Sequence, residues 1–307
     1  MLLKFAIQEF KDDREYKNLS SKTINAYLLT LREFQEFTAK QEVLNAEEVT
    51  QSIIKSYLVY CQKERNNNPT TRNTKLHTLK IFFNYLEGEE YITSKQNPTK
   101  RIGYIKEEIM IEVFTDQHIN QMLNYLRRIK QREHSYAAYR NYVIIVTLLG
   151  TGLRLGELCN LKWEDINFQY LTITVWGKKR EQSSVPMTEK LAKELAEYRI
   201  FCEQHFKQLS HSVFVGQYTN ERLTEQAVKC VFKRLSKVMN FTNCRLSAHT
   251  FRHTFAHRMI MAGCDVLTLQ KLLRHNQLAM TQRYVALWGT ALKEQNDKFN
   301  PLNNLNI

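Results

Sequence analysis

The stretches AHTFRHTF (residues 248–255) and LLRHNQLAMTQRY (residues 272–284) decide how this chain is interpreted. In the first, His249 and Arg252 are three residues apart, so on a helix their side chains share one face and can converge on one ligand. In the second, Tyr284 follows His275 by nine residues. An imidazole, a guanidinium and a phenol can serve as acid or base, phosphate clamp and nucleophile. The pattern indicates covalent attack on a phosphodiester of DNA.

Two further motifs lie upstream of these stretches. In TGLRLGELCNLKWEDI (residues 151–166), Arg154 and Glu157 are spaced for one helix face. An intrahelical ion pair and a functional site explain that spacing equally well. Lys178 falls in the turn WGKKRE between two expected strands, where a long ammonium side chain can swing onto a ligand. Because lysine is common in turns, this position is informative only together with the others.

The amino-acid composition is typical of a globular protein. Its 307 residues are 43% hydrophobic and 24% charged, which fits two domains. The N-terminus has no long apolar region with a cleavage site, and the best apolar run, around residues 142–149, is too short to cross a bilayer. We therefore expect a cytoplasmic protein that does not contact membranes. The six cysteines form no CxxC pair or zinc-spaced cluster, which favours reduced thiols and no metal site.

The net charge of +13 is concentrated in the second part of the chain. Residues 1–113 carry 17 Lys and Arg against 16 Asp and Glu, whereas residues 114–307 carry 27 against 15. A surface of this sign attracts a polyanion, because each neutralised phosphate releases counterions. Charge alone is also compatible with a basic protein that binds no nucleic acid.

Hydrophobic spacing predicts a mainly α-helical fold with a small β-hairpin or sheet. Residues 1–96 are expected to form a helical bundle, with one helix starting after Ser20 and Ser21, a second over residues 47–64 and a third from Thr70 or Thr71 to Gly88. An extended linker is expected at residues 97–113.

A second, mixed α and β unit is expected over residues 114–288, followed by a tail at residues 289–307. Thr115 is a plausible helix cap at its start. Alternating apolar residues after Trp163, the turn GKKREQSS and then Val185 and Pro186 predict the hairpin. Helices are expected to resume from Thr188, Thr224, Ser247 and Val266.

Taken together, these motifs resemble the tyrosine recombinases, the family of phage integrases and Xer-type recombinases, and the resemblance covers nearly the whole chain. Each family motif occurs once and in order. The matching positions are Thr151, Gly152, Arg154 and Glu157 for T-G-x-R-x-x-E; Gly177 and Lys178 for the hairpin turn, with Val185 and Pro186 after it; His249, Arg252 and His253 for H-x-x-R-H; Leu273 and His275 for L-G-H; Thr281 and Tyr284 for T-x-x-Y; and Thr23, Tyr27, Leu31, Phe34, Thr71, Leu79 and Phe83 in the first and last long helices of the bundle.

The resemblance implies a SAM-like core-binding domain followed by a catalytic domain. It implies a site-specific DNA recombinase that cleaves and rejoins DNA through a 3′-phosphotyrosyl intermediate and a Holliday junction, without ATP, metal or another cofactor. The implied partners are double-stranded DNA with inverted-repeat core sites and three further protomers, as a homotetramer or a heterotetramer with a paralogue. The tail would dock on a neighbouring protomer, although a frayed polar terminus explains its last residues equally well. The resemblance implies a nucleoid-associated enzyme that is Xer-like or belongs to a mobile element. Integration, excision, dimer resolution and inversion are all tasks of this family and remain alternatives.

Chemistry assigns a role to each implied catalytic residue. Arg154 and Arg252 would clamp the scissile phosphate, since arginine keeps its charge. Tyr284 would be the nucleophile, with His249 as acid or base and His275 as a hydrogen-bond donor to the phosphate. Lys178 would protonate the leaving 5′ oxygen, and Glu157 would hold Arg154 from behind.

Some assignments remain alternatives. Lys179 is the alternative to Lys178 as the catalytic lysine. The basic side of the third helix either contacts DNA or simply faces solvent. Arg274 replaces the glycine of L-G-H, so either its side chain points outward or its backbone is strained by a positive φ.

A type IB topoisomerase and a non-catalytic DNA-binding accessory protein are the alternative functions. The expected DNA contacts are Lys22, Thr23, Arg72, Lys75, Lys80 and Lys179.

Overall fold

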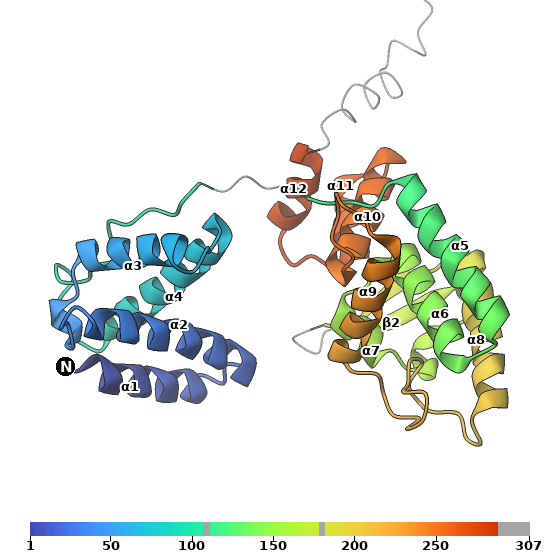
Figure 1. Ribbon diagram of the computed structural model, residues 1–307, viewed down its shortest axis with the longest axis horizontal. Helices are drawn as coiled ribbons and strands as arrows, with labels where there is room; N and C mark the ends of the chain where they lie inside the picture. The colour runs from blue at the N-terminus through green and yellow to red at the C-terminus, as the bar shows by residue number, and fades with distance from the viewer. Residues whose placement is uncertain (107–110, 178–181, 288–307) are drawn as a thin grey trace, which may run out of the picture. The chain divides into compact units, whose positions relative to one another are not determined.

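The computed structural model describes residues 1–106, 111–177 and 182–287, without the side chains of residues 283 and 285–287. The chain divides into two compact units, Met1–Ile109 and Met110–Ile307 (Figure 1). In the described residues both units are mostly helical, and one small antiparallel sheet lies in the second. The fold class predicted from the sequence is confirmed.

The N-terminal unit is a bundle in which three of the four described α-helices begin at side-chain caps. The oxygens of Ser20, Thr50 and Asn68 each accept a hydrogen bond from a backbone N–H three residues on, which stabilises a helix start. The second predicted helix begins four residues later than expected, because residues 46–48 form a separate 3₁₀ turn. The helices are α1 (Leu3–Tyr16), α2 (Ser21–Ala39), α3 (Gln51–Lys63) and α4 (Pro69–Gly88).

Aromatic side chains fill the centre of this bundle. Phe34 meets Tyr57 and Phe83 edge to face, and Phe10 meets Phe82 in the same way. The first residues of the expected linker also pack on this unit, where Ile102 is buried and Asn97 donates hydrogen bonds to side chains of α4. The extended segment therefore begins later than the proline and mixed charge indicate.

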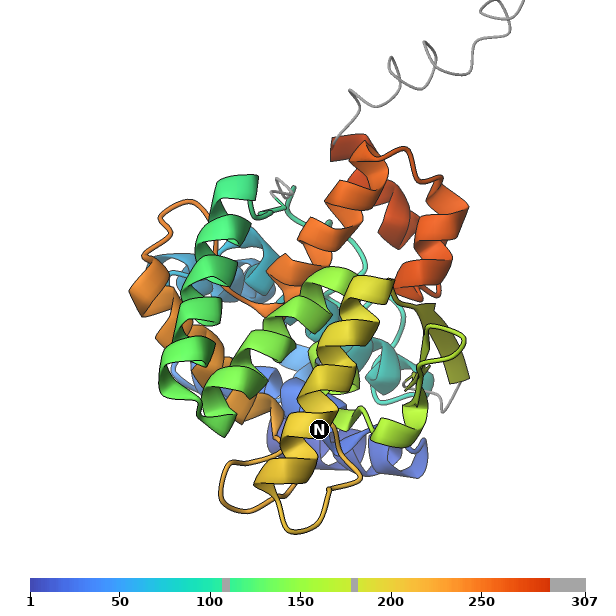
Figure 2. The same cartoon turned by 90° about the vertical axis from the view of Figure 1, so that its right-hand side faces the viewer.

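The second unit is built around α6 (Tyr136–Thr151), which packs against three other helices. It is buried on most sides, and its apolar residues Val143, Ile144 and Ile145 are inaccessible to solvent. Figure 2 shows α6 beside α8 (Glu189–His205). The remaining helices are α5 (Asp116–Glu133), α7 (Leu155–Asn160), α9 (Glu225–Met239), α10 (Ala248–Met261), α11 (Val266–Leu273) and α12 (Leu278–Leu287).

Helix starts in this unit agree with the residues expected from the sequence. Thr115, Thr188, Thr224 and Ser247 each cap a helix through a side-chain oxygen, and α11 begins at Val266 after an aspartate cap. The cap at Ser247 fixes the start of α10, where the first motif stretch lies, and the second stretch runs from the end of α11 into α12.

The sheet has one strand more than the predicted hairpin. Strands β2 (Thr172–Trp176) and β3 (Gln182–Pro186) pair antiparallel, with Ile173 opposite Val185, and β1 (Ile166–Asn167) adds to the other edge of β2. Two residues are too few for β1 to be detected by alternation.

A small apolar cluster lies apart from the main core of the second unit. It joins Ala256 and Ile260 of α10 to Leu269 and Leu273 of α11 and to Tyr284 of α12. Tyr284 is only 4% exposed. Among the helices within the described ranges, none has the length and apolar character needed to cross a membrane.

Candidate active site

Gly152 makes the turn that carries Arg154 into the site. It ends α6 in the left-handed conformation with φ 60°, and a Cβ atom there would lie 2.7 Å from Cδ1 of Phe255 on α10. Glycine meets both demands because it has no Cβ. The chain then turns at once, so that Arg154 becomes the cap residue of α7.

Arg154 and Glu157 form an ion pair at the start of α7. Nη1 of Arg154 lies 2.7 Å from Oε1 of Glu157, and the backbone N–H of Arg154 donates to Oε2 at 2.8 Å. The Glu157 side chain is only 7% exposed, whereas that of Arg154 is 37% exposed. The carboxylate thus holds Arg154 from the protein side and leaves part of its guanidinium accessible. Both interpretations of the sequence spacing are compatible with this geometry.

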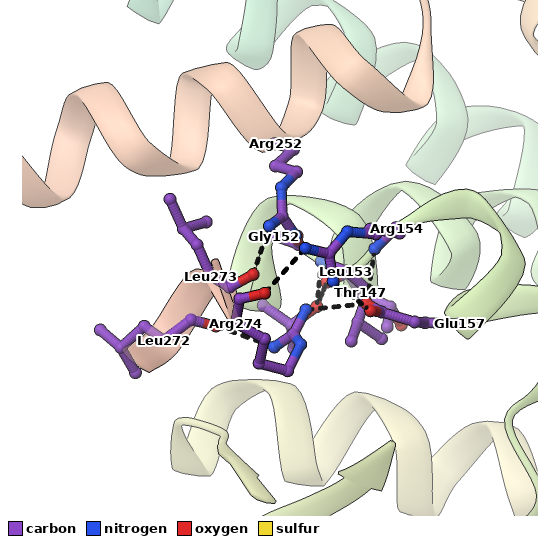
Figure 3. A network of polar contacts seen from close by, with 10 residues as sticks. Thr147, Gly152, Leu153, Arg154, Glu157, Arg252, Leu272, Leu273 and Arg274 are labelled. Atoms are coloured by element: carbon purple, nitrogen blue, oxygen red, sulfur yellow. Dashed lines mark hydrogen bonds and ion pairs between the residues drawn. The ribbon is translucent and has the colours of Figure 1, made fainter. Parts of the chain in front are cut away.

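Arg252 is buried in the middle of α10 and its guanidinium is tied to backbone carbonyls. Nη1 donates to the carbonyl of Gly152 at 2.8 Å, and Nη2 donates to that of Leu273. Nη2 of Arg154 donates to the next carbonyl, that of Arg274, at 2.8 Å. Two guanidinium groups therefore meet consecutive carbonyls at the end of α11 (Figure 3).

Arg274 keeps the backbone conformation of the glycine that it replaces. It follows α11 with φ 55° and ψ 50°, a left-handed conformation that costs a non-glycine residue roughly 1–2 kcal/mol. The outward orientation considered from the sequence is wrong. The side chain turns inward, is 9% exposed, and donates from Nη2 to Oε2 of Glu157 at 2.8 Å.

Electrostatics in this network follow from burial and from three positive charges. Burial alone would raise the pKa of Glu157, but the charge of Arg274 and the hydrogen bonds and charge of Arg154 outweigh it and hold that pKa below its usual value. Burial lowers the pKa of Arg252 to about 9, with the charges of Arg154 and Arg274 acting in the same direction. Arg252 therefore stays charged at neutral pH, and an added anion would relieve the repulsion.

His275 is held by the threonine of the T-x-x-Y motif. Its Nδ1 lies 2.8 Å from Oγ1 of Thr281, and its ring stacks on that of Tyr284 with the centroids 6.1 Å apart. Burial and the neighbouring Arg252 and Arg154 lower the pKa of His275 to about 4. The imidazole is therefore neutral near pH 7. It can offer a ligand a hydrogen bond in a fixed direction, but no positive charge.

The hydroxyl of Tyr284 contacts His253, a residue to which the sequence analysis gave no role. Nδ1 of His253 lies 2.8 Å from the phenolic oxygen. Burial, His249 and Arg252 lower the pKa of His253 to about 4, so its neutral ring can accept the phenolic proton. The second histidine of H-x-x-R-H, one helical turn after His249, was the signal that could have revealed this contact.

Tyr284 itself is shielded from water. Burial raises its pKa, whereas the charges of Arg252 and Arg154 act to lower it. His249, by contrast, is exposed in the first turn of α10, with its ring 6.2 Å from that of His253. The predicted pair of His249 and Arg252 is therefore divided between the surface and the interior.

The remaining predicted residues are not all available at a surface. Lys75 of α4 is buried, and its ammonium lies 2.6 Å from both carboxylate oxygens of Glu33, so its predicted place on a polar helix face is wrong. Arg72 and Lys80 are half-buried, the first donating to Gln62 and the second over the ring of Tyr104. Lys22 is exposed and Thr23 is half-buried. Lys178 and Lys179 lie outside the described residues.

A cation site is not evident in the described parts of the chain, where no three His, Cys, Asp or Glu side chains gather to hold a metal ion. The site is instead rich in arginine.

Comparisons with known proteins identify the family of each unit. Residues 112–288 match the Phage integrase family, and residues 7–93 match the Phage integrase, N-terminal SAM-like domain. A tyrosine recombinase XerC of Leptospira interrogans is 28% identical over 285 residues, which cover 93% of this chain and 89% of that protein. Another, from Listeria innocua, is 27% identical over 288 residues and 93% of both proteins.

Solved structures share the fold. The XerH site-specific recombinase, bound to a palindromic difH substrate in a post-cleavage complex, has a TM-score of 0.75 at 19% identity, over 92% of this chain and 81% of that one. A lambda integrase dimer bound to a COC′ core site has a TM-score of 0.73 at 18% identity, over 91% and 97%.

The family match covers more than half of the chain and includes every motif that the structure brings together. The chain therefore belongs to the phage integrase family of tyrosine recombinases.

Proposed function

We propose that this protein is a site-specific DNA recombinase that cleaves and rejoins DNA through a phosphotyrosyl link to Tyr284. One observation carries the proposal: the hydroxyl of Tyr284 is 2.8 Å from a neutral histidine, in a site where Arg154 and Arg252 meet neighbouring carbonyls. A nucleophile, a proton acceptor and a double positive charge are the groups that attack on a phosphodiester requires.

In the proposed first step, the phenolic oxygen of Tyr284 attacks the phosphorus atom and the bond to the 5′ oxygen breaks. The phenolic proton passes to a histidine of α10, and His253 is already in contact with it. His249, one turn earlier and exposed, is the acid or base predicted from the sequence. Lys178 supplies a proton to the leaving 5′ oxygen.

Arg154 and Arg252 stabilise the charge that develops on the phosphate during this step. Their carbonyl partners are neutral, so phosphate oxygens can replace some of them with a gain in attraction. His275 adds a hydrogen bond to the phosphate. The product is a 3′-phosphotyrosyl link and a free 5′ hydroxyl, and the link conserves the bond energy for religation. Neither ATP nor a metal ion is needed in this scheme.

The proposed partner is double-stranded DNA with inverted-repeat core sites. The net charge of the chain and the DNA named with the XerH and lambda integrase structures support it. Strand exchange would proceed through a Holliday junction in a tetramer, either of this chain alone or with a paralogue, and residues 289–307 would link its protomers.

Covalent trapping tests the reaction. A nicked suicide substrate drawn from a library of candidate sites loses the short strand after cleavage, so a recombinase accumulates as a protein–DNA adduct. We expect this adduct from the natural protein and none from Tyr284→Phe, with sequence-specific binding nearly unchanged because only one hydroxyl is removed. An adduct formed by the Phe variant would show that another residue is the nucleophile.

A two-site assay separates recombination from simple relaxation. With two copies of the trapped site on one plasmid, a recombinase yields deletion or inversion products. Relaxed circles without exchange products would instead indicate a topoisomerase, and binding without either product an accessory protein.

A further inference from the structure

We propose that Arg274 is a positioning residue that holds the buried carboxylate of Glu157 and so leaves the charge of Arg154 available to the scissile phosphate. The inference rests on the proposed function. It adds a role for Arg274, a position at which the family motif L-G-H has a glycine and therefore no side chain that could act in the same way.

Two separate connections join Arg274 to Arg154. The first runs through Glu157, whose Oε2 accepts from Nη2 of Arg274 at 2.8 Å and whose Oε1 accepts from Nη1 of Arg154 at 2.7 Å. The second is direct, since Nη2 of Arg154 donates to the backbone carbonyl of Arg274 at 2.8 Å. A shift at Arg274 would therefore move two of the hydrogen bonds that orient Arg154 (Figure 3).

The orientation of Arg274 is itself fixed. Its Nη1 donates to the carbonyl of Leu272 at 2.8 Å, so one edge of the guanidinium is held by its own chain while the other reaches Glu157. Its left-handed backbone aims the side chain from the end of α11 back toward the start of α7. An outward side chain would avoid the cost of burying a charge. Arg274 turns inward because the ion pair with Glu157 offsets that cost.

Charge balance gives the arrangement its chemical consequence. Glu157 is a single buried carboxylate between two guanidinium groups. With Arg274 present, one positive charge is matched and the other remains in excess. Without Arg274, the carboxylate of Glu157 would pair with Arg154 alone, so its whole charge would offset that of Arg154 and draw it away from the phosphate. The pKa of Glu157 would also rise, because one of its two positive neighbours would be lost while its burial would remain.

The main variant is Arg274→Gly, which keeps the left-handed backbone and removes only the side chain. The matched control is Lys271→Ala, which removes a positive charge from an exposed residue on the same last turn of α11. We expect single-turnover cleavage of the suicide substrate to be about 10–100-fold slower in Arg274→Gly, as for residues that orient a reacting group from behind. DNA affinity should change less than about 3-fold, and the control should cleave at nearly the natural rate.

The pH profile separates positioning from a general structural effect. In Arg274→Gly the pKa of Glu157 should rise. Cleavage should then decline on the acid side at a higher pH than in the natural protein, because a protonated Glu157 no longer holds Arg154 in position through both of its oxygens. Arg274→Lys should restore part of the rate, because an ammonium reaches Glu157 but cannot also bind the Leu272 carbonyl as a planar fork. It also serves as the test variant if the glycine variant folds poorly.

A double-variant cycle with Glu157→Gln decides the route. If Arg274 acts through the carboxylate, Arg274→Gly or Arg274→Lys should have little further effect in the Glu157→Gln background. Equal losses in both backgrounds, or a natural rate and pH profile in Arg274→Gly, would overturn the inference while the natural protein still forms its adduct. Absence of the adduct in the natural protein would instead overturn the proposed function.

Discussion

Buried basic side chains occur in both units of the molecule, but their charges are balanced differently. In the N-terminal unit, the ammonium of Lys75 faces both carboxylate oxygens of Glu33, one positive charge against one negative charge. In the second unit, Arg154, Arg252 and Arg274 gather around Glu157, and within the described residues two of the positive charges have no carboxylate of their own.

We interpret the Lys75 charge as structural and the excess charge of the second unit as the one proposed to act on DNA. The Lys75 pair is complete, so an added anion would gain nothing there. Arg252 is bound to carbonyls of Gly152 and Leu273, which solvate its charge without neutralising it. An excess of positive charge in a partly buried site is unfavourable unless an anion balances it, so we expect the second unit to be the one that binds a phosphate.

The largest effect is expected from removing Arg252, whose positive charge has no carboxylate partner among the described residues. Arg252→Ala should slow covalent cleavage by about 10²–10³-fold, because one donor to the transition-state charge is lost. Binding of the DNA site should weaken much less. The measurement is single-turnover adduct formation beside DNA affinity, with the exposed Arg128→Ala of α5 as a matched control. A loss confined to affinity would contradict the clamp role.

Removing one partner of the Lys75–Glu33 pair should instead lower the stability of the fold. Lys75→Met should lower the free energy of unfolding by about 2–3 kcal/mol, below the figure for a fully buried pair since Glu33 is partly exposed. The double variant Lys75→Met with Glu33→Leu should recover most of it. Urea unfolding of the natural, single and double variants gives this comparison.

DNA contact by Lys75, as the sequence alone indicated, would produce another outcome. The single variant would then keep its stability, while its DNA affinity and the salt dependence of that affinity would both fall.

A smaller effect per residue is expected from pH. His253 and His275 have a pKa of about 4 in the folded chain and near ~6.5 when unfolded, so the unfolded chain binds more protons between these values. Stability is complete above about pH 6.5 and should be lost as the pH falls toward 4. About 2 kcal/mol per histidine is expected at pH 5, which lies roughly 1.5 units below the unfolded pKa.

Urea unfolding at pH 7 and pH 5 measures this loss, and His253→Phe should reduce it. An equal loss in the variant would mean that other groups account for the pH dependence.

Local chemistry explains what could be predicted from the sequence. Ser20, Thr115, Thr188, Thr224 and Ser247 cap helices through atoms within three residues of themselves, so their effect is visible in a short stretch of chain. Each family motif is likewise a short stretch of chain that can be recognised by itself, and Gly152 stands in one of them.

What could not be predicted depends on contacts between distant residues. Arg274 meets Glu157 across 117 positions of the chain, and Lys75 meets Glu33 across 42, so neither partner could be chosen from spacing. His253 lay inside a recognised motif, but its contact with Tyr284 depends on how α12 packs against α10.

The central claim is that Tyr284 carries the covalent link in a site with excess positive charge. The direct measurement is mass spectrometry of the peptide that retains nucleotide after cleavage of the suicide substrate and proteolysis. The account predicts a phosphotyrosyl linkage at Tyr284. A linkage at any of the other tyrosines among the 15 in the chain, or at a serine, would contradict it.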